Sequence, residues 1–209
     1  MKIFKPVENM LSEVEILEIS EILKKGGIMI YPTETVYGIG CNAFDQKKVD
    51  LVYKLKNRSD SQKSSVMVDS VETIEKYVKV GGLEREFISK NLPGPVTIVL
   101  RLKDKYRDVF AKQVVNDCGG VGFRIVKDFV YLKQICEYCD FPILSTSANK
   151  SGVSIERSSS EFAMSFFKDE IDSIDVLIDA GDLGENSPSA VVDITKIPYQ
   201  IIRRGNFNE

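Results

Sequence analysis

The chain of 209 residues contains no histidine, and this absence excludes several kinds of active site. Without histidine there is no Ser-His-Asp or Cys-His nucleophile, no imidazole base and no histidine ligand for a metal ion. An enzyme built from this sequence would have to work by positioning its substrates and through the charges of Lys and Arg, with any metal ion arriving on a substrate.

Long apolar runs are also absent, because no stretch approaches the roughly 18 residues that a transmembrane helix needs. The first residues, MKIFKPVENMLSEVE, lack the apolar core of a signal peptide. Cysteine is scarce, with four in the chain, and the Cys136-x-x-Cys139 pair has no second pair to complete a zinc site. Buried, reduced thiols are the favoured interpretation, and we expect a cytoplasmic protein with no membrane partner.

The charge balance gives no general signature of nucleic-acid binding, since the formal net charge is -3. A role with RNA would therefore need a local basic patch. The apolar fraction of 43% is ordinary for a soluble globular protein, and the length allows a sizeable core. With no internal repeat, linker or low-complexity tract, we expect a single domain over residues 1–209.

Helical and strand patterns alternate along the chain, which predicts an α/β sheet covered by helices. Capping boxes are expected at Ser12 with Glu15 and at Ser158 with Glu161, a helix stop at Gly26, and a helix cap at Asp45. Helices are expected over 12–27, 46–56, 71–80, 83–92, 128–139 and 161–168, and strands over 27–31, 64–70, 96–103, 121–126, 142–147, 175–180, 189–195 and 199–205. Two polar loops, near 103–119 and 179–189, have the length and composition of lids.

Small polar groups and cations stand at the ends of several of these strands. The stretch IMIYPTETVYGIG at residues 28–40 leaves a strand through Thr33, Glu34 and Thr35. Each feature has a plainer alternative: a β-turn for that stretch, a solvated helix end for the cations Lys54, Lys56, Arg58 and Lys63 of KLKNRSDSQKSS, and an exposed edge strand for the arginine of VGFRIV. The further candidates are Lys56, Arg58, Arg124, Ser147, Asn149, Ser189, Arg203 and Arg204. Together they have the composition of a nucleotide or phosphate site at the carboxyl ends of sheet strands.

In order and approximate spacing, the segments YPTETVYGIG, KLKNR, LPGPVTIVL, VGFRIV, STSANKSG, SAVVDIT and IIRRG resemble the YrdC-like family. The resemblance runs from about residue 28 to residue 205, within a motif-bearing core of about 13–205. It implies a twisted mixed β-sheet with helices around a large concave, positively charged cavity. Members join L-threonine, bicarbonate and ATP into threonylcarbamoyl-AMP and release pyrophosphate. That product goes to the proteins that modify tRNA, so tRNA is an expected indirect partner.

The resemblance also implies roles for single residues. Contacts with L-threonine would come from Thr35, Arg124, Ser147 and Ser189, and contacts with ATP from Lys56, Arg58, Gln62, Asn149 and Arg203. Lys56 and Arg58, the K-x-R pair, would act catalytically on the phosphates. Mg²⁺ would arrive with ATP, because no carboxylate cluster resembles a dedicated metal cage.

The chain departs from the family pattern at several positions. Met67 stands where many relatives have histidine, Gly120 where some have a nucleotide-contacting threonine, and Arg204 where the closing motif has proline. Two prolines usual after Arg58 are missing, and Glu34 has no role implied by the motifs. Two other functions stay open: a double-stranded RNA or tRNA-binding protein that uses the same cavity, and a divergent paralogue with another substrate.

Overall fold

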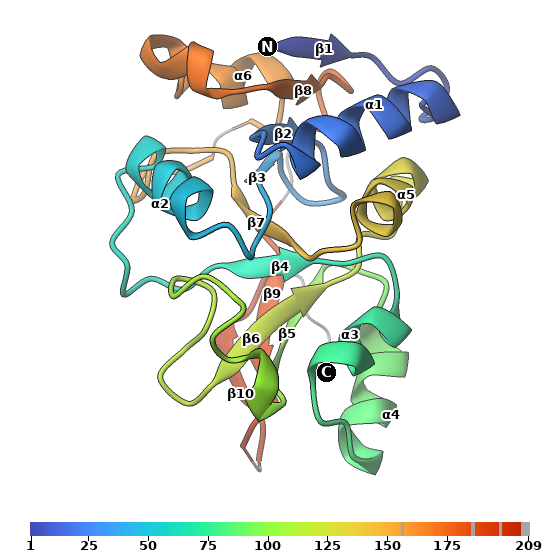
Figure 1. Cartoon of the computed structure of the whole chain (residues 1–209), viewed down its shortest axis with the longest axis vertical. Coiled ribbons are helices and arrows are strands. Elements are labelled where there is room, and N and C mark those ends of the chain that lie inside the picture. The colour runs from blue at the N-terminus through green and yellow to red at the C-terminus, as the bar shows by residue number, and fades with distance from the viewer. Residues whose placement is uncertain (156, 185–186, 197, 206–209) are drawn as a thin grey trace.

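The structure, a computed structural model, describes residues 1–155, 157–184, 187–196 and 198–205. In these residues ten strands join into one mixed sheet in the order β1-β8-β2-β3-β7-β4-β6-β5-β9-β10 (Figure 1). The strands are β1 (Lys2–Phe4), β2 (Met29–Tyr31), β3 (Gly38–Gly40), β4 (Ser65–Met67), β5 (Val96–Arg101), β6 (Gly120–Arg124), β7 (Ile143–Ser147), β8 (Val176–Ile178), β9 (Ala190–Asp193) and β10 (Gln200–Arg203). The predicted α/β class and the mixed sheet are confirmed.

The first two helices begin at the caps that the sequence predicts. The α-helices are α1 (Glu13–Lys24), α2 (Gln46–Leu55), α3 (Val71–Tyr77), α4 (Gly82–Asn91), α5 (Val130–Cys139) and α6 (Ser160–Ser165). Ser12 and Glu15 form the predicted capping box, and Asp45 caps α2 through the backbone N–H of Lys48. Gly26, with φ of 85°, ends α1 in the left-handed conformation that glycine adopts without strain.

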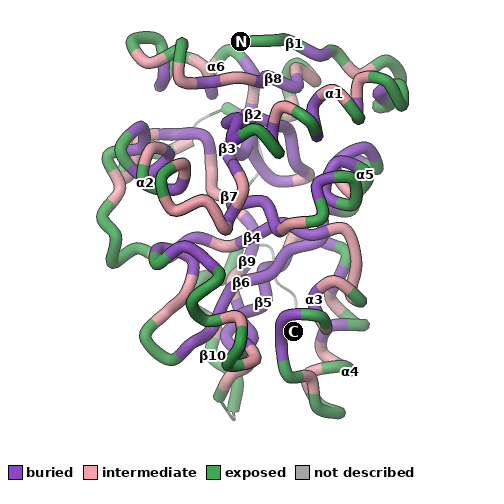
Figure 2. The backbone as a smooth tube through the Cα atoms, viewed as in Figure 1, coloured by how far each residue is buried: buried purple, intermediate pink, exposed green. Residues whose placement is uncertain are grey.

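The two faces of the sheet carry two different cores. Along β2 and the residue before it, Met29 and Tyr31 face one cluster, whereas Ile28 and Ile30 belong to the other, as the two-residue period of a strand requires. Helices α1 and α5 lie beside each other on the Met29 face, and α2, α3, α4 and α6 contribute to the opposite core. Figure 2 shows the burial that results, with the central strands buried and the outer turns of the helices exposed.

One predicted cap is wrong by a single residue. The capping side chain of α6 is Ser159, whose hydroxyl accepts the N–H of Phe162 at 3.1 Å. Ser158 is buried, and its hydroxyl instead accepts the N–H of Tyr37 at 3.2 Å. Ser158 therefore forms a long-range hydrogen bond with Tyr37 instead of capping α6, as its local sequence pattern predicted.

Two short strands were not predicted. β1 pairs in parallel with β8, and β3 pairs with both β2 and β7. β3 depends on Gly40, because a Cβ atom there would lie 2.0 Å from the carbonyl oxygen of Leu144 in β7. The second glycine of YGIG thus allows two strands to approach closely. Among the described residues, no helix is long and apolar enough to cross a membrane.

Candidate functional site

A cavity of about 570 Å³ opens on the face of the sheet that α1 and α5 partly cover. The change from core to cavity happens within single strands. On β7, Ile143 packs in the core with α1 and α5, whereas Ser145 and Ser147, on the same face, line the cavity. On β4, Met67 packs in the same core, whereas Ser65 lines the cavity. The cavity therefore takes up the part of this face where serine replaces large apolar side chains.

Alternation along β6 shows how the sequence builds this surface. Gly120, Gly122 and Arg124 line the cavity, whereas Val121 and Phe123 are buried in the opposite core. A Cβ atom at Gly122 would meet the side chain of Thr97 at 2.9 Å and that of Ser65 at 3.3 Å. Glycine is therefore the residue that keeps this floor clear while the neighbouring side chains stay in place.

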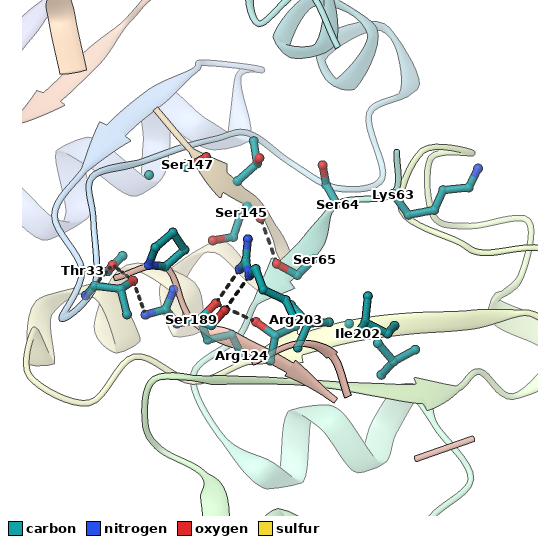
Figure 3. A pocket seen from close by; sticks show the side chains of 18 of the residues that line it. Thr33, Lys63, Ser64, Ser65, Arg124, Ser145, Ser147, Ser189, Ile202 and Arg203 are labelled. Atoms are coloured by element: carbon teal, nitrogen blue, oxygen red, sulfur yellow. Dashed lines mark hydrogen bonds between the residues drawn. The ribbon is translucent and has the colours of Figure 1, made fainter. Parts of the chain in front are cut away.

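The PTET turn forms one end of the cavity. Thr33 organises it, since its Oγ1 accepts the N–H groups of Thr35 and Val36 at 3.2 Å each and donates to the Val36 carbonyl at 2.7 Å. The Thr35 hydroxyl lies 2.9 Å from that of Thr33 and accepts a hydrogen bond of 2.9 Å from Nη2 of Arg124. The stretch that could have been a plain β-turn thus presents hydroxyl groups to the cavity (Figure 3).

Arg124 is buried on an inner strand, so the alternative of an exposed edge strand is excluded. β6 lies between β4 and β5, and Arg124 is 6% exposed. A buried charge needs a partner. Glu34 supplies it, with Oε1 3.1 Å from Arg124 Nη2. This is the structural role of Glu34 that the motifs did not reveal.

Cationic side chains stand farther along the cavity. Arg58 follows the end of α2, where Asn57 takes a left-handed φ of 51° and the Arg58 N–H reaches the Tyr53 carbonyl at 2.9 Å. The Arg58 guanidinium donates to the carbonyls of Gln62 and Lys63 at 3.0 and 2.9 Å, and its central carbon lies 5.6 Å from the centre of the Tyr53 ring. Backbone acceptors and an aromatic ring thus fix the direction of this cation.

Arg203 reaches the cavity from the last strand. Its Nε donates to the Ser189 carbonyl at 2.7 Å and its Nη2 to the Ser189 hydroxyl at 3.1 Å, as the dashed lines in Figure 3 show. The pairing of β10 with β9 shifts register between Ile201 and Arg203. Such a shift is typical of a β-bulge, and here both Ile202 and Arg203 line the cavity.

Six of the predicted site residues line the same cavity: Thr35, Arg58, Arg124, Ser147, Ser189 and Arg203. Three others, Lys56, Gln62 and Asn149, are not among its lining residues. Lys63, a further cation of the KLKNRSDSQKSS segment, also lines it, and sequence reasoning missed several others, including Ser64, Ser65, Thr97 and Asn116. For Ser65 and Thr97, the available signal was a small polar residue at alternate positions of a buried strand.

Lys56 lies beneath the cavity wall, 1% exposed, so the solvated-helix-end alternative is wrong for this residue. Its ammonium donates to the Ser147 carbonyl, to the Asn149 carbonyl at 2.7 Å and to Asn149 Oδ1 at 3.3 Å. Burial, with the nearby charges of Arg58 and Lys150, lowers the pKa of Lys56 to about 7. In this structure Lys56 anchors the chain at the end of β7, and its contact with nucleotide phosphates stays a prediction.

A comparison with known protein families shows to which family this chain is related. The family model described as "Telomere recombination" (Sua5_yciO_yrdC) matches residues 21–205. The chain belongs to the Sua5/YciO/YrdC family.

Members of this family resemble the chain over nearly its whole length. A relative from Methanocaldococcus jannaschii is 35% identical over 208 residues, which is 98% of this chain and 93% of the relative. The threonylcarbamoyl-AMP synthase of Pyrococcus abyssi is 30% identical over 208 residues, and this chain spans 58% of its length. The crystal structure of P. abyssi Sua5 with L-threonine has a TM-score of 0.83 at 27% identity, covering 98% of this chain and 58% of that chain.

The Sua5/YciO/YrdC fold also occurs with lower identity. The crystal structure of Escherichia coli YciO has a TM-score of 0.83 at 22% identity, covering 99% of this chain and 97% of that chain. At this identity the likeness shows the fold alone.

Two departures from the Sua5/YciO/YrdC pattern have a structural account. Met67 is buried under α5, where its carbonyl accepts from Cys136, so the substitution at this position lies outside the cavity lining. Gly120 lines the cavity, and a Cβ there would meet Asn116 Nδ2 at 2.9 Å. The Asn116 amide, held by the Gly120 N–H at 2.7 Å, takes up the space that a larger residue at 120 would need.

No cysteine of the described residues forms a disulfide, and three of the four are buried, whereas Cys118 is exposed. Cys136 and Cys139 are free and buried, and burial raises the pKa of Cys139 to about 12. Within the described residues, no three His, Cys, Asp or Glu side chains form a group that could hold a metal ion.

Proposed function

We propose that this protein is a threonylcarbamoyl-AMP synthase, a nucleotidyltransferase that makes threonylcarbamoyl-AMP and pyrophosphate from L-threonine, bicarbonate and ATP. The observation that carries the proposal is the pairing of two chemical environments in one cavity. One end offers hydroxyl groups beside an arginine, and the other gathers cations on fixed backbone. The name and bound ligand of the P. abyssi relative support the same reaction.

The first end suits a small hydroxy amino acid. The Arg124 guanidinium would hold the α-carboxylate, and the hydroxyls of Thr35, Ser147 and Ser189 would surround the amino acid. Charged hydrogen bonds of this kind contribute roughly 1.5–3 kcal/mol each. Because the cavity floor is made of serine and glycine, the amino acid can lie close to the sheet.

The second end suits a triphosphate. Arg58 and Lys63 supply positive charge there, Arg203 adds a third charge from its place at Ser189, near both Arg124 and Arg58, and ATP would place its phosphates among these cations. The valines and isoleucine nearby, Val99, Val114, Val191 and Ile202, offer apolar surface for the base. Mg²⁺ would come as part of the ATP substrate and share in neutralising the phosphates.

The reaction requires no nucleophile from the protein. The amine of threonine adds to the carbon of bicarbonate, and loss of water leaves a carbamate. A carbamate oxygen then attacks the α-phosphorus of ATP, the bond to the β-phosphate oxygen breaks, and pyrophosphate leaves. Both steps depend on alignment and on neutralising charge, so a chain without histidine can perform them.

Three predicted nucleotide residues would act from behind the cavity wall. Lys56 would hold Ser147 and Asn149 in place through its ammonium, and Gln62 would direct Arg58 through its carbonyl. The adenylate product would then pass to the proteins that transfer its threonylcarbamoyl group to adenosine in tRNA.

The proposal is tested by following pyrophosphate release from ATP with each substrate omitted in turn. The purified protein should release pyrophosphate with ATP, Mg²⁺, bicarbonate and L-threonine together, and lose that release when threonine or bicarbonate is left out. Replacing threonine by serine and other amino acids tests a paralogue with another substrate. Release that is independent of threonine, or none with any amino acid, refutes the proposal.

A further inference from the structure

The cations of the cavity differ in their partners. Of the four cationic side chains that line it, Arg124 is the one paired with a carboxylate among the described residues. Arg58, Lys63 and Arg203 donate instead to backbone carbonyls and to the Ser189 hydroxyl, which carry no charge. Arg124 is therefore the cation of this cavity whose charge is balanced by a carboxylate in direct contact, whereas Arg203, held at Ser189 near both Arg124 and Arg58, has no such contact among the described residues.

The balancing carboxylate cannot be reached from the cavity. The Glu34 side chain is 7% exposed, and both of its carboxylate oxygens are fully buried without a hydrogen-bond donor. Nε of Arg124 is likewise buried and unpartnered. Burying charged groups without hydrogen-bond partners lowers the stability of the fold. An uncharged pair of residues in place of Glu34 and Arg124 would therefore serve a purely structural role at a smaller cost in free energy. A ligand in the cavity would feel Glu34 through its charge and through the guanidinium that it holds.

This inference rests on the proposed function. We propose that Glu34 determines specificity at the amino acid end: its charge cancels that of Arg124, so that this end accepts a zwitterion and rejects inorganic phosphate. Glu34 repels the carboxylate of an amino acid but attracts its ammonium group, and the two effects largely offset each other. A phosphate ion experiences the repulsion alone, and the cavity cations without a carboxylate in direct contact attract it instead.

The expected size of the effect follows from Coulomb's law. At a separation of roughly 6–8 Å and an effective permittivity of about 20, one unit charge changes the affinity for a monoanion by about one to two powers of ten. Removing the charge of Glu34 should therefore strengthen phosphate binding beside Arg124 by at least about tenfold.

The test measures inorganic phosphate as an inhibitor of threonylcarbamoyl-AMP formation, followed by chromatography, at saturating ATP and varied threonine. In Glu34→Gln, phosphate should compete with threonine, with an inhibition constant at least about tenfold below that of the wild-type protein. Glu34→Asp, which keeps the charge, and Asp193→Asn, which removes another buried carboxylate, should keep the wild-type constant. A substitution that merely loosened the site would weaken the binding of every ligand. A gain in phosphate affinity would therefore come from the lost charge of Glu34 and not from structural damage.

An unchanged or higher inhibition constant in folded Glu34→Gln would overturn the proposal. The wild-type protein gives an independent arm, because phosphate should compete there with ATP, and competition with threonine would contradict the inference even if Glu34→Gln does not fold. Absence of threonine-dependent product from the wild-type protein would count against the proposed function instead. Calorimetric titration of wild type and Glu34→Gln with phosphate would then still test the charge balance.

Discussion

Replacing Lys56 by methionine should destabilise the protein in a manner that depends on pH. The substitution keeps the length of the side chain and removes the ammonium that donates to the Ser147 and Asn149 carbonyls. The Asn149 carbonyl then lacks this donor in a buried place, whereas the Ser147 carbonyl still accepts the Asn149 N–H at 3.0 Å, so we expect a loss of about 1–3 kcal/mol where the wild-type lysine is neutral. Asn149 Oδ1 keeps its bond of 2.6 Å from the Ser147 hydroxyl, which limits the damage.

The sign of the pH dependence follows from the direction of the shift. Burial lowers the pKa of Lys56 to about 7, so the unfolded chain binds more protons than the folded one between about pH 7 and the ordinary lysine pKa near 10. The free energy of unfolding contributed by Lys56 therefore rises with pH across this window, with a slope of at most about 1.4 kcal/mol per pH unit. Below pH 7 the folded protein must bury an ammonium, and the advantage of wild type over Lys56→Met shrinks.

Urea unfolding of both proteins at several pH values between 6 and 9.5 measures this difference. Lys54→Met is the matched control, because Lys54 is an exposed lysine in the last turn of α2, two residues before Lys56. Parallel stability curves for wild type and Lys56→Met over the whole range would refute the reasoning about the buried ammonium. A pH-dependent loss in Lys54→Met as well would show that the effect does not come from burial.

Three further substitutions test other parts of the account. Gly40→Ala places a Cβ 2.0 Å from a carbonyl oxygen of β7 and should destabilise the protein by about 3 kcal/mol. Gly82→Ala is the control, because a Cβ there meets nothing within 4 Å. Equal melting temperatures of the two variants would contradict the prediction. Arg58→Met should raise the KM for ATP by at least about tenfold and leave the KM for threonine nearly unchanged in steady-state kinetics, and the reverse pattern would exchange the two ends of the cavity. Ser158→Ala leaves the Tyr37 N–H without its acceptor and should lower the free energy of unfolding by about 1 kcal/mol in urea, and an unchanged free energy would contradict this.

The parts of the fold that local chemistry specifies could be predicted. α1 and α2 begin at Ser12 and Asp45 because those side chains satisfy N–H groups of their own helix. Ser158 shows the limit of this reasoning, since a residue 121 positions away in sequence claims its hydroxyl. β3 escaped prediction because its pairing depends on the approach of two strands at Gly40, which no local pattern contains.

The candidate site was likewise predictable where local sequence specifies a residue, and not where residues distant in sequence come together. Motif order identified the cations and hydroxyls, and alternation on β6 places Gly120, Gly122 and Arg124 on the face that lines the cavity. The partner of Arg124 was not predictable, because Glu34 and Arg124 are brought together by the sheet across 90 residues of sequence. Likewise, no local pattern shows that the Lys56 ammonium turns away from the cavity toward Asn149.

The central claim is that one cavity joins bicarbonate, L-threonine and ATP, and the mass of the product tests it most directly. With ¹³C-bicarbonate, unlabelled threonine and ATP, the account predicts an adenylate that carries a single ¹³C atom, together with pyrophosphate. An unlabelled threonine adenylate, or AMP alone, would contradict it.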